Sequence, residues 1–438
     1  MATRLAPRRW FRTVAALAMA SCLALAGCGG DSDSEDGITT ITFWDDNGGP
    51  ARTPVWEHII AEFERENPTI RVEYVGVPIA QAQQKYDTAI AGGGLPDVGG
   101  VSTAMLANLA ARQALEPVDE RIANSSLDGV LSEQVLESVR ATVPDDKLYL
   151  VPLSTNMGVF WYRTDWFASA GIEPPTSWDE FFTSIERLTE AGQNRYGYTI
   201  RGGAGSIAQL LEVLYGQSGI EEVFDDDGDA TVNDPRNVEA LERITALYGK
   251  FTPEADVTND YVKMVAQFDG GNIGIMQHNL GSYTDHAETL GADKVAAMTV
   301  PPAEDGNRTV TSHPVTGLGV FAEGDKKDAA FAFAEFAAGK EMNRYWSEQT
   351  GVLPANTDVG DLGELTHIAE ATRVLNDPGT ELVQLPYYLP EFNAITKTEA
   401  EPKFQQVLLG ELSEKDFLDE MAGKLTDAQA AYTERTGS

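Results

Sequence analysis

The chain has 438 residues, 42% of them hydrophobic, with 32 Lys and Arg against 68 Asp and Glu and a formal net charge of −36 at pH 7. This length is ample for two or more hydrophobic cores, and the negative charge repels nucleic acid and anionic lipid headgroups, so we expect no nucleic-acid partner. Five His and two Cys, with no HExxH, CxxC or GxSxG motif, leave few residues for metal or triad chemistry, so we expect no metal and no other cofactor.

The first 28 residues have the pattern of an export leader. Four arginines and no acidic residue precede an apolar run at 14–26, which is too short to span a bilayer. The run ends in Leu25-Ala26-Gly27-Cys28, which resembles a bacterial lipobox. This resemblance implies a lipoprotein signal peptide at 1–27 and lipidation of the Cys28 thiol. The alternative is a cysteine near the end of an ordinary signal peptide. Arg8-Arg9 leaves open whether export follows the general or the twin-arginine route.

Residues 28–37 are small and acidic, so they bury nothing and predict a disordered tether. No later apolar stretch is long enough to span a bilayer, so the lipid is the only anchor that we expect. Cys22 leaves with the leader and Cys28 is acylated, which leaves the folded part without a disulfide. These features together predict a protein held by lipid at the extracytoplasmic face of the cell membrane.

Strand and helix patterns alternate from residue 38 onward. Ile41 and Phe43 fit a strand, and Pro54 opens a segment with Val55 and Ile59 on one helical face. The elements predicted here are strands at 38–43, 70–74 and 96–103 and helices at 54–66 and 81–91. This order predicts βαβ organisation, in which ligands bind beyond the carboxyl ends of the strands.

The rest of the chain continues in the same style. Ser177 and Glu180 have the spacing of a capping box, and Asp234-Pro235 places a cap before a proline at the first helical position. Further elements are predicted as strands at 196–200, 272–276 and 315–321 and an apolar helix at 207–215, with mostly helical residues after 321. We find no internal repeat and no long linker.

Four sets of stretches follow one another along the chain: Leu95-Pro96-Asp97-Val98 with 114–118, 149–153 with 160–165 and 174–178, 268–276, and 317–350. In this order they are similar to the extracellular sugar-binding proteins of ABC importers, the family that includes maltose-binding protein. The similarity covers nearly all of the chain after the leader, and the order and spacing of the stretches are more specific than any single one.

The resemblance implies an α/β fold of two lobes that close on a ligand like a clamp. By the family's pattern, three interlobe crossings fall near 152–155, 313–316 and 353–356. The lobes that this implies are 38–152 plus 315–352 for the first and 153–314 plus 353–438 for the second. The role that it implies is that of a monomeric receptor, without enzymatic activity, which delivers a solute to the permease subunits of the importer.

Sugar recognition places two demands on a site. Hydroxyl groups need polar partners, because a desolvated polar group left unpaired costs about 1–3 kcal/mol. The apolar face of a sugar ring needs a flat aromatic surface. We expect such groups at strand ends and crossings, and several of these regions match ligand-contacting regions of the family. The predicted ligand-binding residues are Asp45, Asp46, Asn47, Ser102, Thr103, Asn156, Arg201, Gly203, His278, Asn279, Tyr387 and Tyr388.

The glycine-rich loop 201–205 has three interpretations. Its glycines would let the backbone approach a ligand while Arg201 donates to hydroxyl groups. Arg201 would alternatively form an interlobe salt bridge. Residues 203–208 also fit a dinucleotide fingerprint, but no following strand presents the acid that binds a ribose, so we do not expect that cofactor.

Other candidates have ordinary structural alternatives. Asp45–Asn47 would also form a turn with a helix cap, and aromatic residues such as Trp161 and Tyr162 fit a core better than a site. The acids at 225, 227 and 229 suggest a calcium loop, but Arg236 stands where the bidentate acid belongs. We therefore predict an acidic turn there and leave calcium binding open.

Two rival functions follow from the same residues. A surface-anchored glycoside hydrolase would need two carboxylates about 5–10 Å apart, and 68 acidic residues do not exclude it. The same receptor fold would also serve an amino acid, a polyamine or a phosphorylated polyol. An acid-lined site favours a polyamine, whereas a phosphate needs more cations than Arg201.

Overall fold

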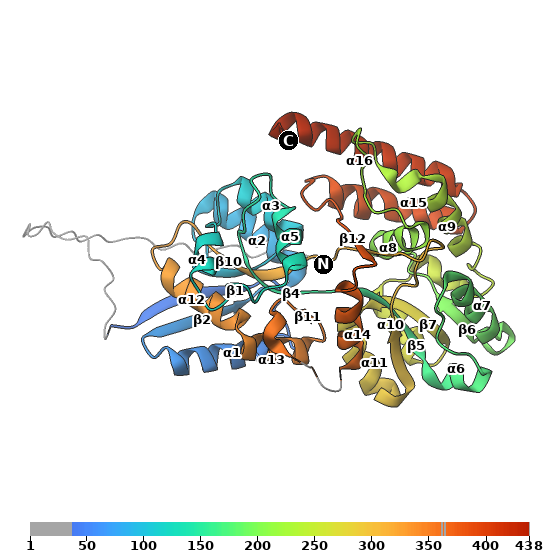
Figure 1. The fold of residues 1–438 in the computed structure, drawn as a ribbon, viewed down its shortest axis with the longest axis horizontal. Coiled ribbons are helices and arrows are strands. Elements are labelled where there is room, and N and C mark those ends of the chain that lie inside the picture. The colour runs from blue at the N-terminus through green and yellow to red at the C-terminus, as the bar shows by residue number, and fades with distance from the viewer. Residues whose placement is uncertain (1–36, 361, 363–364, 438) are drawn as a thin grey trace, which may run out of the picture. The chain divides into compact units, whose positions relative to one another are not determined.

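Two mixed β-sheets organise the part of the chain that this computed structural model describes, residues 37–360, 362 and 365–437 (Figure 1). The predicted leader, Cys28 and residues 28–36 of the predicted tether lie outside the described residues. Both sheets belong to one compact unit, Thr39–Ser438. Among the described residues, no helix combines the length and apolar character needed to cross a membrane.

The first sheet has six strands in the order β11-β4-β10-β3-β1-β2. Its strands are β1 (Thr39–Asp45), β2 (Ile70–Gly76), β3 (Val98–Ser102), β4 (Val151–Thr155), β10 (Thr316–Val320) and β11 (Leu353–Pro354). β1 runs parallel to β2 and β3, whereas β10 is antiparallel to β3 and β4. The carboxyl ends of β1 and β3 therefore lie at one edge of the sheet, together with the start of β10.

Helices cover this sheet and complete its core. Those associated with it are α1 (Thr53–Glu66), α2 (Ile79–Gly92), α3 (Thr103–Ala111), α4 (Asp119–Ala123), α5 (Glu133–Arg140), α12 (Lys327–Ala338) and α13 (Lys340–Thr350). α12 packs on β1, β3, β4 and β10 and also contacts α1 and α13, while α3 packs on β3 and α5 on β4. Apolar contacts hold the helices on the sheet: Phe43 of β1 and Trp56 of α1 are both buried, and their ring centroids lie 4.7 Å apart in an edge-to-face arrangement.

The second sheet has four strands in the order β6-β7-β5-β8. A separate sheet consists of the two strands β12 and β9. The strands are β5 (Gly158–Arg163), β6 (Tyr196–Thr199), β7 (Ile273–Asn279), β8 (Val295–Met298), β9 (Arg308–Thr311) and β12 (Thr380–Val383). The sequence predicted β6 and β7 but not β5, β8, β9 or β12. These four strands form by pairing with segments distant in the sequence.

The remaining helices follow β5. They are α6 (Thr164–Ala170), α7 (Trp178–Leu188), α8 (Ser206–Ser218), α9 (Pro235–Thr245), α10 (Tyr261–Asp269), α11 (Tyr283–Leu290), α14 (Thr366–Leu375), α15 (Glu401–Leu408) and α16 (Glu414–Thr436). Short helices are η1 (Ala191–Gln193), η2 (Thr231–Asn233), η3 (Glu254–Thr258), η4 (Leu280–Ser282), η5 (Ala292–Lys294), η6 (Thr357–Val359) and the π-helix η7 (Ala394–Ala400). The predicted cap is confirmed at Ser177, whose Oγ accepts the Glu180 amide at 3.3 Å.

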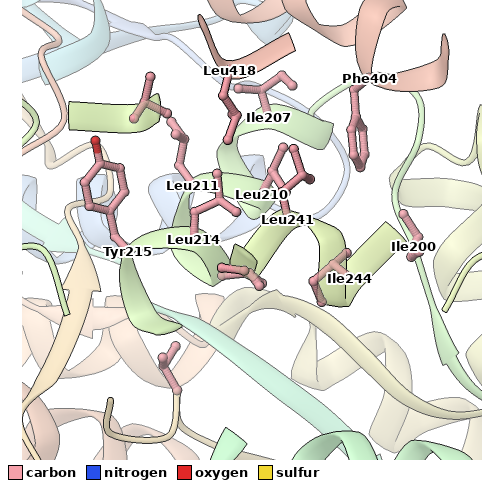
Figure 2. Packing of buried hydrophobic residues seen from close by; sticks show 14 of the residues in the cluster. Ile200, Ile207, Leu210, Leu211, Leu214, Tyr215, Leu241, Ile244, Phe404 and Leu418 are labelled. Atoms are coloured by element: carbon pink, nitrogen blue, oxygen red, sulfur yellow. The ribbon is translucent and has the colours of Figure 1, made fainter. Parts of the chain in front are cut away.

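The apolar helix α8 is buried along most of its length (Figure 2). Ile207 and Leu211 belong to one cluster with Leu241 of α9, Phe404 of α15 and Leu418 of α16. Burial of these side chains brings two helices near the end of the chain against α8. The first turn of α15 therefore lies beside the loop that precedes α8.

Three segments join the first sheet to the rest of the chain: 156–157 after β4, 312–315 before β10, and the residues after β11. We predicted lobe ends at 152 and 352, and these ends stay a prediction. β4 continues to Thr155, and Leu353 of β11 pairs with Thr155, so 153–155 and 353–354 belong to the first sheet. The rest of the division into lobes likewise stays a prediction.

Candidate functional site

The carboxyl end of β1 carries two buried aspartates. Asp45 Oδ1 accepts the Asn47 amide at 3.1 Å and lies 3.2 Å from Arg52 Nε. Asp45 Oδ2 accepts the Tyr74 hydroxyl at 2.9 Å, and Asp46 Oδ1 lies 3.3 Å from Arg52 Nη2. Arg52 thus neutralises both predicted carboxylates, as in the structural alternative of a turn. Of the three predicted residues, Asn47 alone is exposed.

Asp46 is also confined by the neighbouring strand. A Cβ on Gly100 of β3 would lie 2.5 Å from Asp46 Oδ1, so glycine is required where the carboxylate crosses the strand. Burial raises the pKa of Asp46, and the nearby Arg52 opposes that rise. Asp46 is therefore a constrained internal group, with little freedom to follow a ligand.

The residues at the carboxyl end of β3 are hydrogen-bonded to the second crossing, 312–315. Thr103 is buried, its Oγ1 accepts the Val315 amide at 3.1 Å, and its own amide donates to the Val315 carbonyl at 2.9 Å. These bonds give Thr103 a structural role. Ser102 is half-buried, and its hydroxyl makes no hydrogen bond within the described chain, so it stays available to a ligand.

Two predicted asparagines meet at the first crossing. Asn156 Oδ1 accepts the amides of Met157 at 3.0 Å and Leu280 at 3.1 Å, which ties the crossing to the end of β7. A Cβ on Gly281 would lie 3.4 Å from Asn279 Oδ1 and 3.8 Å from Asn156 Nδ2. The two amides therefore flank Gly281, and the sequence did not mark this glycine as part of a site.

Arg201 lies in the loop between β6 and α8. Its Nε donates to the Ala204 carbonyl at 2.5 Å, and a Cβ on Gly205 would lie 2.3 Å from Arg201 Nη2. Gly205, with φ at +85°, makes room for the guanidinium group. Neither Nη atom makes a hydrogen bond or ion pair with any residue that the structure describes. The interlobe salt bridge that we considered for Arg201 does not form with those residues.

The other loop glycines approach the protein's own backbone. The Gly202 amide donates to the Asp256 carbonyl at 3.1 Å, and the Gly203 amide donates to the Asn259 carbonyl at 2.7 Å. A Cβ on Gly203 would lie 2.8 Å from that Asn259 oxygen. We predicted that these glycines let the backbone reach a ligand. In the structure they instead let the loop pack on residues 256–259, so Gly203 supports Arg201.

Two acids and a tyrosine surround Arg201. Burial lowers the pKa of Arg201, and the charges of Glu401, Asp260 and Tyr261 act in the opposite direction. Glu401 Oε1 accepts the Gly205 amide at 2.6 Å, although the two residues are 196 positions apart. No local pattern marked Glu401 or Tyr261, because only the packing of α15 and α10 brings them to this loop.

His278 of β7 completes this group. Its ring stacks on Tyr261 with centroids 4.4 Å apart and an angle of 26° between the planes. Burial, followed by the nearby Arg201, lowers the pKa of His278 to about 3, so the imidazole is neutral at pH 7. Its Nδ1 is buried and has no hydrogen-bond partner in the described chain. Such a nitrogen is suited to a ligand hydroxyl group, which can donate or accept. We call Arg201, Glu401, Tyr261 and His278 the Arg201 group.

The two predicted tyrosines lie elsewhere. The Tyr387 hydroxyl donates to the Ser312 carbonyl at 3.4 Å, and the Tyr388 hydroxyl donates to Gln429 Oε1 at 2.6 Å. Together with Thr103 they line a cavity of about 30 Å³. Within the described chain, no hydrogen bond, ion pair or ring contact joins either tyrosine to Arg201. Their packing matches the ordinary alternative for aromatic residues.

Behind the loop, Asp256 is a buried acid. Its Oδ2 accepts the Ile200 amide at 2.8 Å, while Oδ1 accepts Asn259 Nδ2 at 2.7 Å and Gln267 Nε2 at 3.2 Å. Burial raises the pKa of Asp256 to about 7 and outweighs these hydrogen bonds, which act to lower it. Asp256 and Asn259 also accept the loop amides, so this network positions Arg201.

We expect stability to depend on the protonation of Asp256. Its folded pKa of about 7 exceeds the ordinary value of 3.8, so its contribution to stability is complete below about pH 4 and is lost as the pH rises through 7. The difference corresponds to about 4 kcal/mol, as an order of magnitude. Urea unfolding between pH 4.5 and 8 measures it, with Asp256→Asn as the variant that cannot titrate. Equal pH dependence of the two proteins would contradict this assignment.

The acidic turn forms where the sequence predicted one. Asp225 Oδ1 accepts the amides of Asp227 at 3.0 Å and Asp229 at 2.9 Å. Within the described ranges, no group of three or more His, Cys, Asp and Glu side chains is arranged to hold a metal ion. The turn therefore needs no ion to explain its conformation.

A model of the bacterial extracellular solute-binding proteins matches residues 49–344, more than half of the chain. The chain belongs to this family. The match includes Arg201 and His278, whereas Glu401 lies beyond it. The family and its structural neighbours are binding proteins.

Relatives and solved structures of other solute-binding proteins extend the comparison. A mannitol-binding protein of Pseudomonas aeruginosa is 26% identical over 381 residues, which cover 81% of this chain and 86% of that protein. An ABC substrate-binding protein from Listeria monocytogenes, in complex with cycloalternan, has a TM-score of 0.74 at 22% identity and covers 90% of this chain and 99% of its own. The GacH receptor of Streptomyces glaucescens, solved with acarbose, has a TM-score of 0.73 at 24% identity, with 91% and 98% covered. The predicted two-lobe α/β fold is thereby confirmed.

Proposed function

We propose that this chain is the lipid-anchored, extracytoplasmic receptor of an ABC importer and that it binds a carbohydrate between its two lobes. Membership of the solute-binding family supports the receptor role. The observation that carries the carbohydrate assignment is the Arg201 group, in which a guanidinium with two uncommitted Nη atoms lies near Glu401 and a Tyr261–His278 stack. The proteins named above for mannitol, cycloalternan and acarbose support the same ligand class.

The chemistry of the Arg201 group matches a polyhydroxylated ligand. Arg201 donates hydrogen bonds, Glu401 keeps Oε2 as an acceptor, and the neutral His278 adds an unpaired nitrogen. One cation near two acids leaves this group net negative, which disfavours an anionic ligand in a partly desolvated site. A phosphate would require more cations here, and a polyamine more acids.

The proposed mechanism is binding by closure of the two lobes. Asn47 and Ser102 would contact the sugar from the first lobe, the Arg201 group from the second, and Asn156 and Asn279 from the crossing. The solute then contributes contacts to both lobes at once, which favours the closed form. That form is presented to the permease by a monomer that Cys28 anchors through its lipid.

Turnover does not fit the acids described. A glycosidase needs two carboxylates about 5–10 Å apart that are free to act on the bond. Asp45 and Asp46 are both paired with Arg52, so neither is free to act as the second carboxylate beside Glu401. We therefore propose binding without hydrolysis, with a non-sugar solute as the alternative ligand for the same receptor.

The test is a thermal-shift screen of the chain from residue 31 onward, which contains the whole unit Thr39–Ser438. The compounds are mono-, di- and oligosaccharides, polyols, amino acids, polyamines and glycerol phosphates. A ligand at 100 times its dissociation constant adds about 2.7 kcal/mol, which raises the midpoint by a few degrees. A selective sugar that is recovered unchanged supports the proposal. Cleavage of the sugar indicates the hydrolase, and a response only to non-sugars refutes the carbohydrate assignment.

A further inference from the structure

A second cavity lies where all three crossings meet. Its volume is about 360 Å³, and its walls include Thr155 of β4, Thr311 of β9 and Leu353 of β11, the strands beside the three crossings. Helices α5 and α14 close its sides. The cavity reaches solvent along α14, where Ala369 and Thr372 are exposed. We call it the hinge cavity.

The lining of the hinge cavity is mostly apolar, and its one titratable side chain among the described residues is His313, which contacts Glu212. Val135, Leu353 and Ile368 contribute apolar surface, and no Asp, Glu, Lys or Arg is among its described lining residues. The hydroxyls of Thr155 and Thr311 make no hydrogen bond within the described chain and can bond to an occupant. Small-molecule sites commonly have this size and this combination of apolar walls with a few polar groups.

The hinge cavity is separate from the proposed solute site. Of the predicted ligand-binding residues only Asn156 lines it, and the Asn156 Oδ1 is already bonded to the Leu280 amide. None of its described lining residues belongs to the Arg201 group. A molecule in the cavity would therefore make its contacts independently of the solute.

The cavity bridges the two halves of the fold. Gln134 of α5 donates from Nε2 to the Leu375 carbonyl of α14 at 2.6 Å, and Gln384 Nε2 donates to Ser138 Oγ of α5 at 3.0 Å. α5 packs on the first sheet, whereas α14 packs on β8 and β12 and also reaches β11 at the border of the first sheet. An occupant would touch both helices and reinforce the arrangement that these two hydrogen bonds hold.

We propose that the hinge cavity is a second binding site, for a small, uncharged and largely apolar molecule that carries one or two hydrogen-bonding groups. Its occupancy opposes any movement that separates α5 from α14. If closure on a solute requires that movement, the two ligands bind with negative coupling, and each lowers the affinity of the other by the same factor. The coupling rests on the proposed function, whereas the site itself does not.

The test uses an uncharged polarity-sensitive fluorophore, 6-propionyl-2-(dimethylamino)naphthalene, titrated into the chain from residue 31 onward. We expect saturable binding of one molecule with blue-shifted emission. Ala369→Phe places a ring at the mouth of the cavity and should weaken binding at least tenfold. Ala111→Phe makes the same exposed change on α3, away from the cavity, and should leave binding unchanged. Thr372→Trp, also at the mouth, repeats the test if Ala369→Phe does not fold.

The outcomes distinguish the hinge site, the carbohydrate assignment and the coupling between the two sites. Absence of saturable binding, or equal binding by Ala369→Phe and Ala111→Phe, overturns the hinge site whatever the sugar screen shows. Fluorophore binding without a sugar response supports the hinge site and counts against the carbohydrate assignment. When both ligands bind, an unchanged fluorophore affinity at saturating sugar overturns the coupling.

Discussion

Replacing Glu212 by alanine is expected to lower the free energy of unfolding by about 3–5 kcal/mol, because it leaves the buried Gln277 and the partly buried His313 without their acceptor. Glu212 of α8 is 5% exposed and contacts His313 Nε2 through Oε1. Its Oε2 accepts Gln277 Nε2 at 2.8 Å. His313 belongs to the second crossing, so the loss should also loosen the connection between the lobes. Urea unfolding at pH 7 measures the change.

The surroundings of Glu212 explain the size of this effect. A Cβ on Gly158, the first residue after the first crossing, would lie 2.1 Å from Glu212 Oε2. The carboxylate is thus enclosed by both crossings and cannot turn to solvent. Glu212→Gln keeps the shape and one acceptor and should cost much less than Glu212→Ala. A loss below about 1 kcal/mol for the alanine variant would show that the contact with His313 contributes little.

Replacing Arg201 by alanine is expected to weaken sugar binding about 10- to 100-fold, since a hydrogen bond from a charged donor contributes about 1.5–3 kcal/mol. Stability should change much less, because the described chain gives Arg201 a single hydrogen bond, to the Ala204 carbonyl. Isothermal titration with the sugar found in the screen measures the affinity. Arg201→Lys keeps the charge but loses the planar set of donors, so it should restore only part of the affinity.

The matched control is Arg187→Ala. Arg187 is an exposed arginine of α7 that likewise donates to one carbonyl, that of Ala170 at 2.9 Å. It removes the same charge from the same lobe, so it should leave sugar affinity unchanged. Equal affinity losses in the two variants would indicate a general charge effect and would remove Arg201 from the proposed site.

Local structure could be predicted where neighbours in the sequence determine it. The alternation of Ile41 and Phe43 marked β1, and the spacing of Ser177 and Glu180 marked the start of α7. The acidic turn at Asp225 formed for the same reason, since its hydrogen bonds join residues two and four positions apart. Such features depend on interactions within a few residues, and those can be inferred from the pattern alone.

The sequence by itself also determined the family and the two-lobe α/β fold, because order and spacing of many short stretches persist where single residues change. Only the tertiary structure decided what the candidate site residues contact. Arg52 neutralises Asp45 and Asp46, Gly203 packs on Asn259, and Glu401 joins Arg201. These assignments depend on contacts between segments that are distant in the sequence. The pattern of residues around a polar group therefore does not show which side chain will pair with it or confine it.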